Sequence, residues 1–110
     1  MIDIQNVLID ISADASNSLG FKTNGLLLSG IEFPAAMTGS NITFDYSIDN
    51  TNWIDVVETD GTEVTYVVSV GNIQRLDPSG WAFAGEGWLR ITSDGTEAAD
   101  RTLKVYTRHS

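Results

Sequence analysis

Apolar and polar side chains alternate with a period of two along several short runs of this chain. Every second residue is apolar or β-branched in the runs 7–11, 42–48, 64–70, 89–91 and 103–107. Successive side chains of a β-strand point to opposite faces, so this period places one face of each run in a core and the other outside. The runs are therefore predicted to be β-strands.

Clusters of residues that favour turns separate these runs. They read SNSLG, TNG, MTGSN, DNTN, TDGT, DPSG and SDGT. No stretch keeps a 3.6-residue period between helix caps, and the one helical candidate is a single turn near PSGWAFAG. About eight short strands, with a turn every ten or so residues, predict an all-β fold that is an antiparallel β-sandwich or jelly roll. The 110 residues are expected to form one such domain.

The charge of the chain is strongly negative and unevenly distributed. The formal net charge is −9, and residues 1–71 contain ten acids and one base, whereas residues 72–110 contain five of each. The sign is wrong for binding phosphate backbones, so we expect no nucleic-acid partner. The acidic part either confers solubility or forms an outer face, with the neutral part as an attachment surface.

The remaining composition narrows the class of protein further. The chain has no cysteine, so disulfides and thiolate metal sites are excluded. No run approaches membrane-spanning length, and the start of the chain lacks the basic residues and unbroken apolar run of a signal peptide. We expect a soluble protein that has no membrane partner and is not exported by that route.

The residues that carry common enzyme chemistry are sparse. His109 is the only histidine and lies next to the last residue, where a preorganised catalytic base is not expected. Asp55, Glu58 and Asp60 lie close together, but hydrolysis of a sugar by paired carboxylates needs a deep cleft, for which two sheets leave little chain. We therefore predict no enzyme, no catalytic residue and no cofactor.

The stretch DYSIDNTNWIDVV has two interpretations. Asp49, Asn50, Asn52 and Asp55 offer the hard oxygen ligands that suit calcium, although their spacing is not that of an EF-hand loop. Alternatively, the stretch is a hairpin in which Asp49 and Asn50 enter the turn, Asn52 is left-handed and Trp53 begins the returning strand. We predict the hairpin, with no metal ligand among these residues.

Aromatic residues are the candidates for a binding surface. Trp53, Trp81 and Trp88 could form a stacking platform for sugar rings if they are exposed. Trp81 and Phe83 lie outside any clear strand, so their loop either covers the open end of the sandwich or is offered to a partner as an anchor.

The N-terminal segment is the other candidate for an interface. Residues 1–5 precede the regular strand pattern and could add an edge strand to a neighbouring molecule. The alternation changes phase around Gln5 and Asn6, which predicts a bulge or short bend. The candidate interface residues are therefore Met1, Ile2 and Ile4, together with Trp81 and Phe83.

Residues 25–108 carry a resemblance to a known module. GLLLSGIEFPAAMTGSNITFDYSIDNTNWIDVVETDGTEVTY and IQRLDPSGWAFAGEGWLRITSDGTEAADRTLKVYTR resemble the two halves of a β-sandwich found in virion proteins of tailed bacteriophages. The features that carry the resemblance are FPAA, the TG turn, S-x-D-x-x-x-W, WLRITS and AADRTLKV. The S-x-D-x-x-x-W hairpin is also similar to discoidin-like jelly-roll modules that bind carbohydrate.

The phage resemblance implies a structural role without catalytic residues. It implies a capsid cement or decoration protein, or a part of a tail or fibre, whose partners are the major capsid protein or other virion proteins. Such a protein would be made in the host cytoplasm and located on the capsid surface, and a homo-oligomer, either a trimer or a dimer, would be compatible with that role. The chain has no long arm or coiled coil, which favours the capsid surface over a fibre. The discoidin-like resemblance implies the alternative, a module that binds a glycan.

Overall fold

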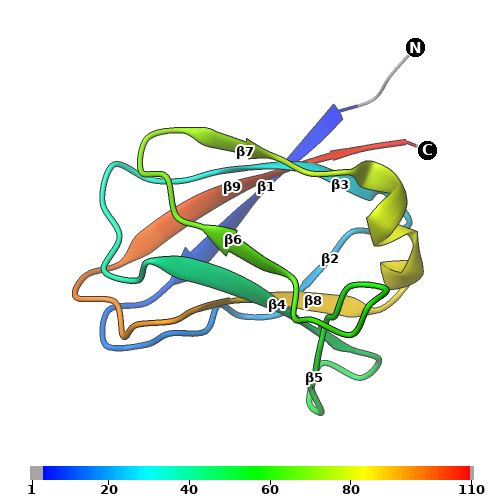
Figure 1. The fold of residues 1–110 in the computed structure, drawn as a ribbon, viewed down its shortest axis with the longest axis horizontal. Coiled ribbons are helices and arrows are strands. Elements are labelled where there is room, and N and C mark those ends of the chain that lie inside the picture. Colours follow the sequence, from blue (N-terminus) through cyan, green and yellow to red (C-terminus); the bar gives the residue numbers. More distant parts are fainter. Residues whose placement is uncertain (1–3, 110) are drawn as a thin grey trace.

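The computed structural model describes residues 4–109 of the chain, and these residues form a β-sandwich (Figure 1). Two antiparallel sheets pack face to face, and a 3₁₀ helix lies at one end of the sandwich. The predicted all-β sandwich is confirmed. In chain order the elements are β1 (Ile4–Ile11), β2 (Phe21–Lys22), β3 (Leu27–Glu32), β4 (Asn41–Ser47), β5 (Ile54–Asp55), β6 (Thr65–Val67), β7 (Ile73–Arg75), η1 (Pro78–Ala84), β8 (Trp88–Ser93) and β9 (Arg101–Arg108).

The strand order brings segments far apart in the sequence together. The first sheet has the order β1-β9-β3-β7, and the second has the order β2-β8-β4-β5, with β6 also paired to β4. β5 and β6 therefore lie along the same side of β4, one beside its end and the other beside its start. This arrangement places the connection between β5 and β6 next to η1 (Figure 1).

The inward faces of both sheets form one hydrophobic core. Its fully buried members include pairs of alternating residues from three strands: Ile42 and Phe44, Leu89 and Ile91, and Leu103 and Val105. Burying each such side chain contributes roughly 1.5–3 kcal/mol. The alternation fails at Ile48, which was predicted to face the core but is 82% exposed, because β4 ends at Ser47 and the chain turns there.

The predicted bulge at Gln5 and Asn6 is wrong. The whole of Ile4–Ile11 pairs with β9 without a register shift. The irregularity lies in β3 instead, where the register with β9 shifts just after Leu28. An extra residue in a strand changes which side chains face inward, and Leu28 and Ile31, three residues apart, are accordingly both fully buried.

The stretch near PSGWAFAG, where a single helical turn was considered, forms the seven-residue 3₁₀ helix η1. Pro78 occupies its first turn, and the Asp77 carboxylate accepts a hydrogen bond from the Ser79 backbone N–H at 3.2 Å. Side chains three residues apart eclipse one another in a 3₁₀ helix, and the buried residues are Trp81 and Ala84. No helix within the described range is long and apolar enough to cross a membrane.

A buried carboxylate joins two loops at the end of the sandwich opposite η1. Glu97 has no exposed surface. Backbone N–H groups of Thr38 and Gly39 donate to its two oxygens at 2.8 and 2.9 Å. The Ser93 hydroxyl and Nε of Arg101 donate to it at 2.7 and 2.9 Å. Burial raises the pKa of Glu97, but these hydrogen bonds lower it by more, and its pKa is about 2.

Candidate functional site

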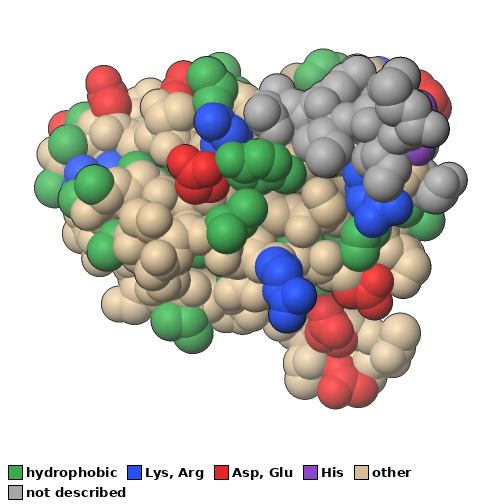
Figure 2. Space-filling model, turned by 90° about the horizontal axis from the view of Figure 1, so that it is seen from above, with side chains coloured by type: hydrophobic (Ala, Val, Ile, Leu, Met, Phe, Trp, Pro, Cys, Tyr) green, Lys and Arg blue, Asp and Glu red, His purple; other side chains and the backbone are tan. Residues whose placement is uncertain are grey.

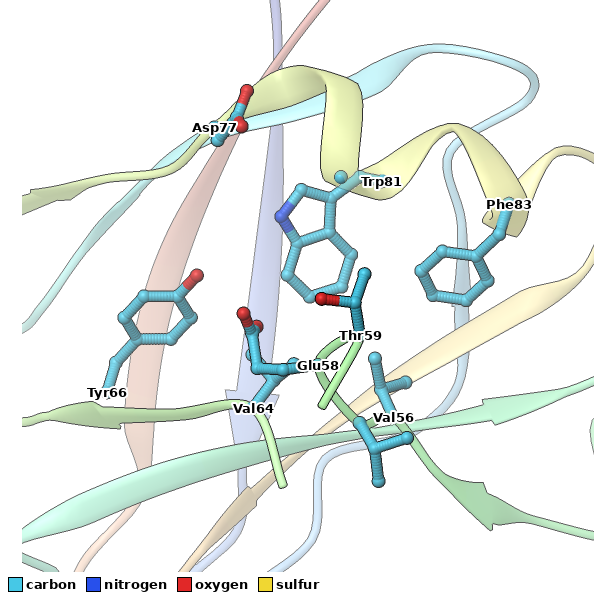
Figure 3. A pocket seen from close by; sticks show the side chains of 10 residues that line it. Val56, Glu58, Thr59, Val64, Tyr66, Asp77, Trp81 and Phe83 are labelled. Carbon is cyan, nitrogen blue, oxygen red and sulfur yellow. The ribbon is translucent and has the colours of Figure 1, made fainter. Parts of the chain in front are cut away.

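Two adjoining hollows lie between η1 and the β5 hairpin, which comprises residues 54–64. Their volumes are about 230 and 340 Å³, and they share Val56, Val57 and Phe83. We call the joined hollows the η1 groove, and Figure 3 shows the residues that line the hollow of about 230 Å³. It is lined by Tyr46, residues 54–59, Val64, Tyr66, Asp77, Gly80, Trp81 and Phe83.

The β5 hairpin is held in place by backbone hydrogen bonds and a tight turn. The N–H of Val56 donates to the carbonyl of Phe44 at 3.0 Å, so the hairpin is an extension of the β4 sheet. At its tip, Gly61 has a φ of 89°, a conformation that glycine adopts without strain. The Asp60 carboxylate accepts bonds from the backbone N–H and hydroxyl of Thr62, which lowers the pKa of Asp60. The tip is therefore a defined turn that fixes the position of the groove's outer wall.

The two aromatic residues of η1 have different environments. Trp81 is 4% exposed and packs against Phe44, with ring centroids 4.6 Å apart. Phe83 is 50% exposed, and its ring contacts Tyr46 at 5.6 Å and Trp81 at 6.0 Å. The prediction that treated Trp81 and Phe83 alike is corrected: Trp81 belongs to the core because η1 packs it over the open end of the sandwich. Phe83 alone is offered to the surface.

Two acidic groups, Glu58 and Asp77, line the hollow that contains Trp81. Figure 3 shows Tyr66, Glu58 and Asp77 on one side of the Trp81 indole and Phe83 on the other. Burial raises the pKa of Tyr66, and the negative charges of Glu58 and Asp77 raise it further. Among the residues that the structure describes, three acids and no lysine or arginine line the groove. The groove is thus apolar at its base and negative at its rim.

The acidic character continues along the β5 hairpin. Asp55, Glu58, Asp60 and Glu63 are all exposed. On the face of the molecule shown in Figure 2, acidic side chains gather on a projecting corner. Of the three acids considered for sugar hydrolysis, Asp55 and Glu58 line different hollows, and Asp60 is bonded within the turn.

Sequence reasoning missed several residues of the groove. The fold brings Asp77 and Glu58 to the same hollow, although nineteen positions separate them in the sequence. The DPS stretch carried the signal of a helix N-cap followed by proline, which could have indicated η1. Ile54 and Val57 are 65% and 51% exposed, and the apolar run in WIDVV was the available sign of a surface patch.

The hairpin interpretation of DYSIDNTNWIDVV is correct in outline and wrong in two details. The returning strand, β5, begins at Ile54 and not at Trp53. β4 and β5 pair at Tyr46 and Ile54, but the left-handed residue is Asn50, with φ of 60°, and not Asn52. The Asp49 carboxylate accepts bonds from the backbone N–H groups of Asn52 and Thr51, which lower the pKa of Asp49. Within residues 4–109, no group of three or more His, Cys, Asp or Glu side chains is arranged to hold a metal ion.

The three tryptophans do not form one platform. Trp53 and Trp88 lie on the outer face of the second sheet, and Trp81 lies in the core. Arg90 is 4.6 Å from the centroid of Trp53, and Lys22 is 5.1 Å from that of Trp88. These two half-buried indoles therefore each pair with a cation of their own sheet.

The N-terminal interface residues fall partly within the described structure. The backbone of Ile4 belongs to β1, and β1 is an edge strand whose one partner within residues 4–109 is β9. Leu8 on this strand is 64% exposed. Met1 and Ile2 lie outside the described residues.

Sequence comparisons with known proteins identify no relative. No model of a protein family matches the chain, and no curated protein sequence matches it significantly.

Proposed function

We propose that this chain is a non-enzymatic structural protein of a tailed-bacteriophage virion, and that it is a cement or decoration protein of the capsid surface. The observation that carries the binding role is the η1 groove, in which Phe83, Ile54 and Val57 are 50%, 65% and 51% exposed and lie close together. Single exposed apolar residues are ordinary on a protein surface, but a group that lines one groove is typical of a contact site. The assignment to the virion and to the capsid surface rests on the resemblance of residues 25–108 to the phage module.

The groove suits a role in which many copies each bind weakly. Covering the exposed parts of Phe83, Ile54 and Val57 would contribute roughly 1 kcal/mol per side chain. Such a contact is weak in isolation, but many copies on one shell hold adjacent subunits together through multivalency. The ring of Phe83 is already held by Tyr46 and Trp81, so binding costs little side-chain entropy there.

The proposal is tested on particles of the phage that encodes the chain. Particles are banded on a density gradient, and the chain is quantified by peptide mass spectrometry relative to the major capsid protein. We expect a fixed ratio in the particle band and a lower ratio for Phe83→Ser. A chain that is found only in the soluble fraction contradicts the proposal.

A glycan-binding module is the second candidate, and one observation favours it. The aromatic rings of Tyr46 and Phe83 line the same hollow as the Asp55 carboxylate, and sugar sites combine aromatic and carboxylate groups. This function predicts reproducible binding on a glycan array and a change in tryptophan fluorescence on titration with the bound sugar. If the array shows no reproducible binding and the fluorescence does not change, the glycan-binding function is excluded.

A further inference from the structure

We infer that the η1 groove binds a protein segment in which a lysine or arginine side chain stands next to an apolar one. The inference rests on the proposed function and deepens it, because it states the chemistry of the partner that the surface would contact.

The shape of the groove provides two adjacent places for two side chains. The hollow of about 230 Å³ has Trp81 and Val64 at its base and Glu58 at its rim. The hollow of about 340 Å³ is bounded by Tyr46, Ile54 and Phe83. Because the two hollows share the Phe83 wall, neighbouring side chains of one segment can enter both.

The charge of the groove indicates which side chain enters the first hollow. In the described part of the chain, Glu58, which lines this hollow, has no ion-pair partner, whereas Arg90 and Arg101 are paired with Asp45 and Glu97 elsewhere. Asp77 uses one oxygen to accept bonds from Ser79 and supplies a further negative charge. A cationic group that enters here gains attraction from carboxylates that no residue lining the groove neutralises.

The aromatic wall supports the same side chain. Lysine and arginine have apolar stems with a charged head, and they pack favourably against aromatic rings. Trp81, Tyr66 and Phe83 supply these rings, and Glu58 and Asp77 line the same hollow. The net charge of −9 also attracts a basic segment at long range and increases its association rate.

The second hollow favours a protein segment over a sugar. Its most exposed members, Ile54 and Val57, are aliphatic and cannot stack on a sugar ring. The Phe83 ring is engaged edge-on with Tyr46, at an interplanar angle of 63°. An aliphatic or aromatic side chain of a protein fills such a hollow by ordinary apolar contact.

The test uses the full chain and a displayed library of random 12-residue peptides, followed by synthesis of the most enriched sequence. Its affinity is measured by calorimetry for the wild type and for Glu58→Gln/Asp77→Asn. Asparagine also caps a helix, so the second change removes a charge and keeps the cap of η1. The matched control is Glu63→Gln/Glu86→Gln, which changes the net charge equally at two exposed acids outside the groove.

We expect enriched peptides to contain Lys or Arg beside an apolar residue. At low salt, Glu58→Gln/Asp77→Asn should weaken binding at least tenfold and the control less than twofold. Phe83→Ala should weaken it about fivefold at low and high salt, because it removes an apolar contact of roughly 1 kcal/mol. Enriched peptides without a basic residue overturn the inference, as does equal weakening by the groove and control variants, or a sugar that binds the groove in place of any peptide.

The particle experiment separates this inference from the proposed function. If the chain is found in virions and Glu58→Gln/Asp77→Asn occupies them as well as the wild type does, the inference fails and the proposed function stands. If basic peptides bind the groove but the chain is absent from virions, the proposed function fails and the chemistry of the groove stands.

Discussion

Replacing Glu97 with glutamine should reduce the free energy of unfolding by about 3 kcal/mol at neutral pH and by much less near pH 2. The carboxyl group has a pKa of about 2 in the folded protein and an ordinary value of 4.5. Each pKa difference of one corresponds to about 1.4 kcal/mol of preference for the charged form, so the shift amounts to about 3 kcal/mol. The folded-state pKa is the lower one, so this stability is complete above about pH 5 and is lost as the pH falls toward 2.

The hydrogen bonds of Glu97 lead independently to a similar loss of unfolding free energy in Glu97→Gln. Glutamine has the shape of glutamate, but its amide NH₂ cannot accept the bonds that one carboxylate oxygen accepts. If the amide replaces Oε2, then the Gly39 N–H and the Ser93 hydroxyl lose their acceptor in a site with no exposed surface. An unsatisfied buried donor costs about 1–3 kcal/mol, and Arg101 also loses its charged partner.

The assay is urea unfolding followed by tryptophan fluorescence at several pH values between 7 and 2. Glu58→Gln is the control, because Glu58 is exposed and should change stability by less than about 0.5 kcal/mol. Exposed acids with lowered pKa values, such as Asp49 and Asp94, titrate equally in the wild type and in Glu97→Gln, so they do not contribute to the difference between them. A loss below about 1 kcal/mol at pH 7 would refute the reasoning, as would a variant that loses as much stability on acidification as the wild type.

Three further predictions follow from single positions. Trp81→Ala should cost about 3–5 kcal/mol in thermal or urea unfolding, whereas Phe83→Ala should cost about 1 kcal/mol, and equal costs would mean that η1 does not separate core from surface. Gly61→Ala should lower the free energy of unfolding by about 1 kcal/mol or more, because φ is 89° at this position, although nothing lies within 4 Å of the added Cβ. Gly80→Ala also places its Cβ in open space, and it should be nearly neutral in the same denaturation measurement. The phenol pKa of Tyr66, followed by NMR of a ring-labelled sample, should lie above 10 and should fall in Glu58→Gln/Asp77→Asn, because two negative charges that oppose ionisation are removed; an unchanged pKa would contradict that electrostatic account.

The strands were predictable because their signal is local. The alternation at Leu89 and Ile91, and again at Leu103 and Val105, depends only on the geometry of an extended backbone, and all four residues are fully buried. The same rule failed at Ile48, because the end of a strand is set by the turn that follows it. Hydrogen bonds of the Asp49 carboxylate begin that turn.

The buried carboxylate could not be predicted, because its partners come from distant parts of the chain. Glu97 and Glu86 look alike in the sequence, and each lies among small and glycine residues. The donors to Glu97 at Thr38 and Gly39 are brought to it only when the loops at the end of the sandwich meet.

The sequence by itself determined the class of fold, because the alternation of apolar and polar residues and the frequent turn residues are signals that depend only on near neighbours in the chain. The tertiary structure decided which side chains form a surface. Tyr46, Glu58 and Asp77 belong to three segments, and the η1 groove exists only because β5 and η1 pack beside the end of β4. It likewise decided that Trp81 is buried and Phe83 is half exposed, because burial depends on what packs against a residue, and in this case that contact comes from elements distant in the chain.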